Sequence, residues 1–348
     1  PLGGTVVGAN GDSHATDDEL LELFVRQNDE GIASILLAQV DDATSPHNGG
    51  FPDQYGIYHV GSAAWNVCAM VAGFVSPGSA FHQSTEIAER ISRAMDFVKR
   101  LQHEDGTVDL ITTNFHSPPD TAFRVEPIAL ALSIARSRSA DQLAPFEKTA
   151  EAFLSAAGRA LIAGGVHTPN HRWVVCMALA RINALLPDSR LVNRADQWLA
   201  EGIDIDSDGQ FTERSTSGYS PLINRWLITA GRLLNRPELF EPVRKNLDLT
   251  RYFIHPNGEL VTEVSRRQDQ YRRSNAAAYY YSYRYLANRF QDGSLAAMAR
   301  FIVDARDLEL DNPAADPDLM EEIASVTGAV PLPPEQFGTF LEELLEQG

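Results

Sequence analysis

Apolar residues recur every three to four positions along most of the chain, and this spacing predicts a mainly α-helical protein. The first clear segment covers residues 18–40, with Thr16 or Asp17 placed to cap its start. Ten further segments follow the same pattern: residues 61–74, 85–102, 121–136, 142–162, 170–186, 191–200, 221–234, 237–253, 271–290 and 295–307. A weaker helical pair is predicted after Pro317 and Pro334.

A polar, glycine-containing loop recurs between these helical segments. The five copies read HNGGFPDQ, EDGTVDLI, GGVHTPNH, SDGQFTER and PNGELVTE, built on Gly50, Gly106, Gly165, Gly209 and Gly258. Their spacing of roughly 50 residues is the length of one helical hairpin, so each loop should lie at the same end of its hairpin. Stacked hairpins bury their apolar faces on one another, and closure into a ring removes the exposed ends. We therefore predict an all-α fold, an (α/α)6 toroid of helical hairpins with short extended loops on one rim.

The domain organisation follows from this pattern. Residues 18–310 are predicted to form one toroid catalytic domain. Residues 1–17 are an N-terminal extension that begins with Pro-Leu-Gly, a sequence typical of a cleavage scar, and residues 311–348 are a C-terminal helical segment that could link to a further domain. The compartment cannot be read from the chain; a periplasmic or secreted bacterial location is favoured over a cytoplasmic one.

Composition narrows the range of partners. The formal net charge is −18, which repels phosphate backbones and argues against nucleic acid as a partner. No apolar run is long enough for a membrane span. Cys68 and Cys176 lie in apolar helical patterns and are interpreted as buried thiols. The nine histidines form no helical metal-binding motif, because Pro169 interrupts the spacing of His167 and His171, so we expect neither a metal nor a cofactor.

The stretch 164–173, GGVHTPNHRW, concentrates chemically useful side chains before an apolar helix. Pro169 is suited to the first turn of that helix, which places Asn170, His171 and Arg172 at its N-terminus. An imidazole beside an amide at this position suits a site that binds negative charge and moves a proton. The alternative is a capped helix start with a solvated histidine.

The other candidates share a position in or beside the recurrent loops. They are Asp120, Glu213 and Tyr219 as possible catalytic groups with Asn170 and His171, and His116, His167, Arg172, Trp173, Arg214, Arg266, Arg267, Tyr271 and Asn275 as substrate-binding residues. Asp120 stands at a helix entrance, so it is either an N-cap or a catalytic acid. The arginine run at 266–273 can bind carboxylates, or it can be an exposed helix face balanced by Asp269. Some of the tyrosines in 279–285 should pack in the core, while others could form a sugar-binding floor.

These features resemble known enzyme families. The glycine loops at this spacing are similar to those of the six-hairpin glycosidases and the toroid polysaccharide lyases. The pair Asn170-His171 followed by Arg214 and Tyr219 resembles the Asn-His, Arg and Tyr arrangement of heparinase- and alginate-lyase-like enzymes. The resemblance implies cleavage of a glycosidic bond at a uronic acid, such as glucuronate, by β-elimination. In that chemistry Asn170 would neutralise the carboxylate, His171 would be the base, and Tyr219 would be base or acid.

Two alternatives stay open. Related β-glucuronidase-type and unsaturated-glucuronyl hydrolases use the same toroid with carboxylic acids, for which Asp120, Glu213 and Glu263 are candidates. Many lyases of this kind also continue into a β-sandwich, and nothing rich in strands follows Asp311. The second alternative is a non-catalytic helical-repeat binding protein. The expected partner of either enzyme is a uronate-containing oligosaccharide or polysaccharide, whereas the binding protein would bind uronates or peptides. A homo-oligomer is compatible with the sequence.

Overall fold

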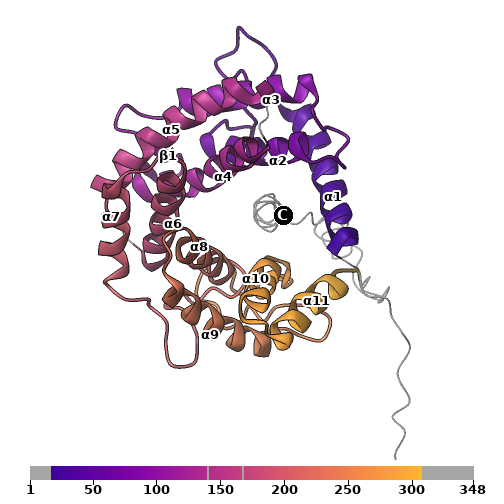
Figure 1. Cartoon of the computed structure of the whole chain (residues 1–348), viewed down its shortest axis with the longest axis vertical. Coiled ribbons are helices and arrows are strands. Elements are labelled where there is room, and N and C mark those ends of the chain that lie inside the picture. Colours follow the sequence, from indigo (N-terminus) through magenta and orange to yellow (C-terminus); the bar gives the residue numbers. More distant parts are fainter. Residues whose placement is uncertain (1–16, 139–140, 167, 308–348) are drawn as a thin grey trace, which may run out of the picture.

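The computed structural model describes residues 17–138, 141–166 and 168–307. These residues form eleven α-helices that follow one another around a ring (Figure 1). Their bounds are α1 Asp17–Ala38, α2 Val60–Val75, α3 Thr85–Arg100, α4 Pro118–Ser137, α5 Ala144–Ala163, α6 Pro169–Leu185, α7 Ser189–Leu199, α8 Tyr219–Leu233, α9 Phe240–Thr250, α10 Tyr280–Phe290 and α11 Gly293–Asp307. The predicted helical pair after Pro317 lies outside the described residues.

The helices form two concentric layers. The inner layer consists of α2, α4, α6, α8 and α10, and consecutive members of it contact one another. The outer layer consists of α3, α5, α7, α9 and α11, each packed on the preceding inner helix of its hairpin. Helix α1 packs on α2 and also meets α10, where the Phe24 and Tyr280 rings lie edge to face with centroids 5.8 Å apart. The predicted all-α toroid is confirmed.

Most predicted helices agree with the structure to within three residues at each end, but the segment 271–290 is wrong in its first half. Helix α10 begins only at Tyr280. Tyr271 has a left-handed backbone (φ 62°), and the Leu260 N–H donates to the Ser274 carbonyl over 2.8 Å. Because this pairing with a distant part of the loop ties down the backbone, the helical periodicity of the segment is overridden.

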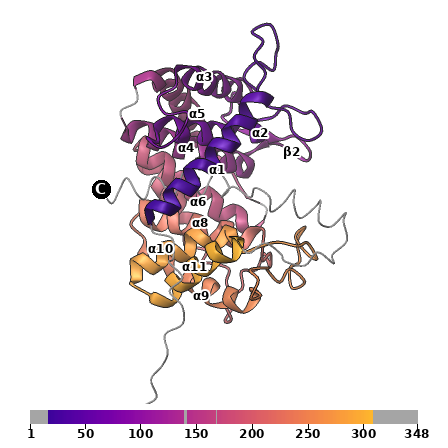
Figure 2. The same cartoon turned by 90° about the vertical axis from the view of Figure 1, so that its right-hand side faces the viewer.

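The connection from α1 to α2 and each connection from an outer helix to the next inner helix lie at the same rim of the ring. These connections carry all five recurrent glycines, as predicted, and they appear on the right-hand side of Figure 2. The second connection contains the antiparallel strands β1 (Val108–Leu110) and β2 (Asn114–Ser117), while the first, fourth and fifth contain isolated β-bridges. We call this end of the ring the loop rim. The N-termini of the inner helices point toward it.

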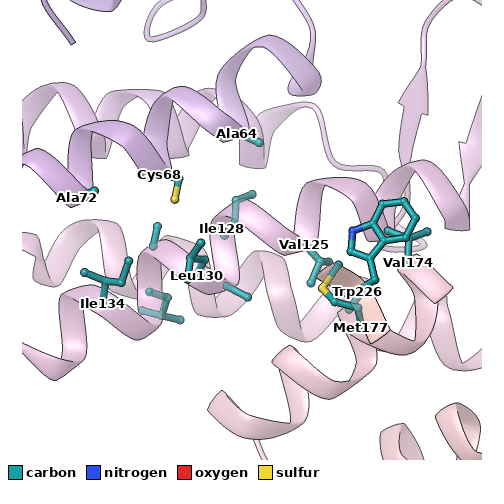
Figure 3. Close-up of a cluster of buried hydrophobic side chains, with 14 of the residues drawn as sticks. Ala64, Cys68, Ala72, Val125, Ile128, Leu130, Ile134, Val174, Met177 and Trp226 are labelled. Carbon is teal, nitrogen blue, oxygen red and sulfur yellow. The ribbon is translucent and has the colours of Figure 1, made fainter. Parts of the chain in front are cut away.

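The core fills the space between the inner helices and their neighbours. Figure 3 shows Cys68 of α2, Ile128 of α4 and Trp226 of α8 among these buried side chains. Cys68 and Cys176 are both buried and form no disulfide, as predicted, and burial raises the pKa of the Cys176 thiol far above its usual range. None of the helices in the described part of the chain is both long and apolar enough to cross a membrane.

The close docking of the rim turns predicts a clear difference between two glycines. A Cβ added to Gly106 (φ 89°) would lie 2.2 Å from the Ala156 carbonyl oxygen of α5, whereas one added to Gly56 (φ 78°) meets nothing within 4 Å. Gly56→Ala should therefore carry only the backbone penalty of about 1–2 kcal/mol, while Gly106→Ala should lose about 1–3 kcal/mol more. Urea unfolding of both variants measures this difference. Equal losses would show that the turn does not depend on its contact with α5.

Candidate functional site

The centre of the candidate site is the start of α6. Pro169 is the first helical residue, as predicted, and Asn170 behind it is only 1% exposed. The Thr168 hydroxyl donates to the Asn170 side-chain oxygen. The Asn170 backbone N–H points at a carboxylate oxygen of Glu213, 3.4 Å away. This helix N-terminus is therefore joined to the fourth connection of the loop rim through a buried carboxylate.

Glu213 also holds an arginine from the fifth connection. Its side chain is 1% exposed and forms an ion pair with Arg267, whose side chain is 33% exposed. The Arg267 guanidinium carbon lies 4.7 Å from the centroid of the Tyr219 ring, and the Gln268 amide donates to the Tyr219 hydroxyl over 3.2 Å. A guanidinium fixed by a carboxylate on one side and an aromatic ring on another is oriented to bind a second carboxylate with its remaining N–H groups.

An aromatic cluster packs against His171. The His171 ring meets Phe123 of α4 edge to face, with ring centroids 6.3 Å apart, and Phe123 packs on Trp226 of α8 with centroids 5.3 Å apart. The Trp226 indole N–H donates to Glu126 over 3.0 Å. The imidazole of His171 is half-buried, so it keeps access to the rim while its orientation is set by packing.

Asp120 stands at the start of α4, but it is not the N-cap of that helix. Ser117 is the cap, and its hydroxyl accepts from the Asp120 N–H and donates to the Asp120 carboxylate. The Asn114 amide donates to the same carboxylate over 3.4 Å. The capping alternative for Asp120 is therefore wrong, because a serine three residues earlier in the chain satisfies the helix end.

A second arginine lies next to Asp120, and a second imidazole lies beside that arginine. Burial lowers the pKa of Arg124 on α4, and the charge of Asp120 partly offsets that effect. Burial also lowers the pKa of His59, as does the charge of Arg124, while Asp53 at 3.6 Å acts in the opposite direction. The net effect lowers the pKa of His59, which favours the neutral form of its imidazole.

Two further groups were missed by sequence reasoning. Glu126 and Arg225 form a buried ion pair between α4 and α8, with the Arg225 Nε 2.9 Å from the carboxylate. Burial raises the pKa of Glu126, but Arg225 and the Trp226 N–H lower it by more. The sequence does contain a signal for this pair, because Glu126 and Arg225 are charged residues within the largely apolar runs VEPIALAL and NRWLI. Such charges in a core helix face a partner in the same interior.

Three predicted substrate-binding residues have structural partners away from the central group. The Arg172 guanidinium lies 3.2 Å from carboxylates of Glu201 and Asp204 and covers the Trp173 ring. Trp173 is fully buried, and its indole N–H donates to Asp204 over 2.8 Å. His116 stacks on His103 and pairs with an aspartate over 2.7 Å. These side chains organise the loops rather than face the site.

The remaining predicted residues are spread along the fourth and fifth connections. Arg214 meets Arg266 through its backbone carbonyl, which accepts from the Arg266 N–H over 2.7 Å. Tyr271 is 75% exposed, and the Asn275 side chain accepts from the backbone at the start of the 3-10 turn before α10. His167 lies outside the described residues. The structure thus brings together Asn170, Glu213, Tyr219 and Arg267 from the predicted set, and His171 follows Asn170 on the first turn of α6.

Asp269 anchors the loop that carries Arg267. It is buried and accepts from the Ser215 and Ser265 hydroxyls at 3.0 and 2.9 Å and from the Ser217 N–H at 3.0 Å. Burial raises its pKa, but these hydrogen bonds lower it by more, so the net pKa lies below 3.8. The interpretation of this segment as an exposed helix balanced by Asp269 is wrong, because Asp269 faces inward.

This anchor predicts a pH-dependent effect of Asp269→Asn. A carboxylate with a lowered pKa stabilises the fold fully above its unfolded pKa of 3.8, and the stabilisation is lost as the pH falls through the folded value. The variant should lose about 2 kcal/mol at neutral pH. The Tm difference from the parent should stay constant between about pH 7 and 5 and shrink below about pH 4. A difference that persists unchanged at the lowest pH would mean that the charge of Asp269 is not what anchors the loop.

Cavities and metal-binding groups do not add to this site. A cavity of about 610 Å³ lies between α7 and α9, and one of about 940 Å³ lies between α1 and residues 76–81. Neither is lined by the residues around Arg267. In residues 17–138, 141–166 and 168–307, no group of three His, Cys, Asp or Glu side chains is arranged to hold a metal ion.

Comparison with solved structures identifies the fold class. The sequence matches no known protein family, and no curated protein matches it. A sugar epimerase from a ruminal bacterium is similar over 94% of this chain and 99% of its own, with a TM-score of 0.61 and 13% identity. Cellobiose 2-epimerase from Bacillus thermoamylovorans is similar over 95% and 100%, with a TM-score of 0.62 and 10% identity. An unsaturated glucuronyl hydrolase specific for heparin is similar over 94% and 98%, with a TM-score of 0.55 and 10% identity. At these identities the similarity shows the fold, the (α/α)6 toroid, and not the activity.

Proposed function

We propose that the protein is a saccharide-active enzyme that binds an acidic sugar at the loop rim and cleaves its glycosidic bond by β-elimination. The observation that carries the proposal is the oriented guanidinium of Arg267, held by Glu213 and Tyr219 beside the start of α6. Arg267 would bind the carboxylate of a uronic acid such as glucuronate. Binding there increases the acidity of the adjacent C5 proton, because negative charge develops on the carboxylate as that proton leaves.

The proton transfers in this proposal fall to His171 and Tyr219. One group removes the C5 proton, and the other protonates the oxygen that leaves C4, so that a C4–C5 double bond forms and no water is consumed. Asn170 holds the Glu213 carboxylate through its backbone N–H, and so helps to position the group that orients Arg267. Neither step needs a metal or a cofactor.

Hydrolysis is supported less well by the same geometry. A hydrolase needs one carboxyl group that gives up a proton and another that activates water or attacks the sugar. Glu213 is engaged by Arg267 and the Asn170 N–H, so its role is to orient rather than to donate a proton. Asp120 is the remaining inward-facing candidate, and Glu263 is exposed.

Product analysis tests the proposal. Oligosaccharides and polymers that contain glucuronate or related uronic acids are incubated with the full chain. Elimination produces an unsaturated uronate that absorbs ultraviolet light, whereas hydrolysis produces a saturated one. Both reactions release a new reducing end, so the absorbance and not the reducing end distinguishes them. Saturated products only, across these substrates, would replace elimination by hydrolysis.

Epimerisation is a second candidate, favoured by His59 and Arg124. His59 precedes α2 and lies beside Arg124, and α4 separates α2 from α6, which carries His171. An imidazole could remove a proton from the carbon next to the carbonyl of a ring-opened sugar, and a second imidazole could return one to the opposite face. Two of the structurally similar proteins are epimerases. Deuterium incorporated from D2O into an intact sugar, without chain cleavage, distinguishes this reaction from elimination.

A further inference from the structure

The fifth connection folds into a loop with two distinct sides. Two hydrogen bonds hold the ends of this loop together. The Thr262 hydroxyl donates to the Arg272 carbonyl over 2.6 Å, and the Leu260 N–H donates to the Ser274 carbonyl. Between these points the chain alternates in burial: Ser265 and Asp269 face the fourth connection, and other residues face outward. We call residues 262–274 the arginine loop.

The outward side of the arginine loop is basic and partly aromatic. Arg266, Arg272 and Arg273 are exposed, with Glu263 as the one exposed carboxylate of the loop. Neither Asp269 nor Glu213 neutralises the charge on this side. Asp269 is buried and accepts hydrogen bonds from three serines, and Glu213 is paired with Arg267. Tyr271 is 75% exposed, and Val264 is 41% exposed. A concentrated positive charge on a chain with a net charge of −18 is an unusual local arrangement.

We infer that the outward side of the arginine loop is an accessory binding surface for an acidic polysaccharide, separate from the reacting sugar. The inference rests on the proposed function in that the bound polymer would continue from the sugar held by Arg267. Arg272 and Arg273 would contact carboxylates or sulfates of neighbouring sugar units, and the Tyr271 ring would lie against a pyranose face. The substrate class is then a polymer that extends past the site, rather than a disaccharide.

Two features favour a saccharide over another polyanion. The net charge of −18 repels any long polyanion outside the short basic loop, and it repels a nucleic acid most strongly, because a nucleic acid carries a charge on every nucleotide whereas uncharged sugars separate the charged units of a polymer such as hyaluronan. The loop also exposes one aromatic ring, that of Tyr271, beside its arginines. This arrangement fits an acidic sugar polymer, in which apolar pyranose faces alternate with charged groups. A second copy of this chain, whose acidic surface could also meet these arginines, is the remaining occupant to be tested.

The experiment measures binding without turnover. The full chain is titrated with long hyaluronan, with a hyaluronan tetrasaccharide and with single-stranded DNA of similar charge, at several salt concentrations. The double variant Arg272→Gln/Arg273→Gln is compared with Lys148→Gln/Arg159→Gln, which removes two positive charges from the exposed side of α5. The arginine-loop variant should bind long hyaluronan about three- to thirtyfold more weakly with a shallower salt dependence, and the α5 variant should bind like the parent.

The outcomes separate the possible explanations. Equal weakening in both double variants, or a loss of DNA binding as large as the loss of hyaluronan binding, would overturn the inference, because total charge alone would account for it. A change in oligomeric state in the arginine-loop variant, with unchanged polymer binding, would assign the surface to a second copy instead and also overturn it. Tetrasaccharide binding should be unaffected by either variant. The titration measures binding and no product, so its result does not depend on the proposed elimination chemistry. A failure of that chemistry would appear in the product analysis, as an absence of unsaturated products.

Discussion

Replacement of Tyr219 by Phe is expected to lower turnover of an acidic-sugar substrate by about two to four decades, the usual effect of removing a positioned acid or base. The variant keeps the ring that lies under Arg267 and removes only the hydroxyl that accepts from Gln268. Because packing is preserved, the unfolding free energy should change by less than about 1 kcal/mol. Steady-state kinetics and urea unfolding of the same preparation check both statements.

The matched control is Tyr283→Phe. Tyr283 donates its hydroxyl to the Leu247 carbonyl over 2.7 Å, in the buried contact between α10 and α9. Its loss should reduce stability by about 1 kcal/mol and leave turnover unchanged. The opposite ranking is expected for a hydrolase: Asp120→Asn or Glu213→Gln would then be nearly inactive and Tyr219→Phe would keep much of its rate. Near-native turnover of Tyr219→Phe would rule out the elimination mechanism.

The architecture could be predicted from local signals that repeat. The apolar spacing gives the helices, and the recurrent glycine turns give their grouping into hairpins. The structure adds the physical reason for the repeat. Gly106 packs against the Ala156 carbonyl of α5, and Gly209 packs against the Lys245 carbonyl of α9 in the same way. Each of these turns therefore docks on the outer helix of the next hairpin, which requires a glycine at an equivalent place.

The identity of the central arginine could not be predicted in this way. Arg214, Arg266 and Arg267 were all candidate substrate-binding residues, and the motif resemblance paired Tyr219 with Arg214, which is close to it in sequence. In the structure Arg267 occupies that place, because Asp269 accepts from serines of the fourth connection and holds the arginine loop across it. That arrangement depends on residues some 50 positions apart, and no local pattern reports it.

Helical periodicity also did not determine which side chains on the first turn of α6 face the site. Asn170, His171 and Arg172 were all predicted at the helix start, and all three are there. Arg172 is nevertheless drawn toward Glu201 and Asp204 in the following connection. An acidic partner on another segment decides the direction of a long flexible side chain, and the pattern within one helix does not contain that information.

Arg267→Met is expected to lower turnover by about one to two decades, since a charge-assisted contact to a carboxylate contributes about 1.5–3 kcal/mol. The same substitution should destabilise the fold, because it leaves the Glu213 carboxylate buried without its ion-pair partner. One third of the Arg267 side chain is exposed, so we expect a loss of about 2–3 kcal/mol, below the usual range for a fully buried pair. The matched control is Arg266→Met, because Arg266 is exposed and its backbone makes the contact with Arg214.

A second substitution separates the effect on binding from the effect on stability. In Glu213→Gln/Arg267→Met the buried carboxylate is gone, so much of the lost stability should return, while turnover should stay low because no guanidinium remains to hold the substrate carboxylate. Kinetics and urea unfolding of the parent, both single variants and the double variant complete the cycle. If turnover recovers together with stability, Arg267 supports the fold and does not bind the substrate. If instead Arg266→Met is the variant that loses turnover, the exposed neighbour binds the carboxylate, and the ion pair with Glu213 only fixes the loop that presents it.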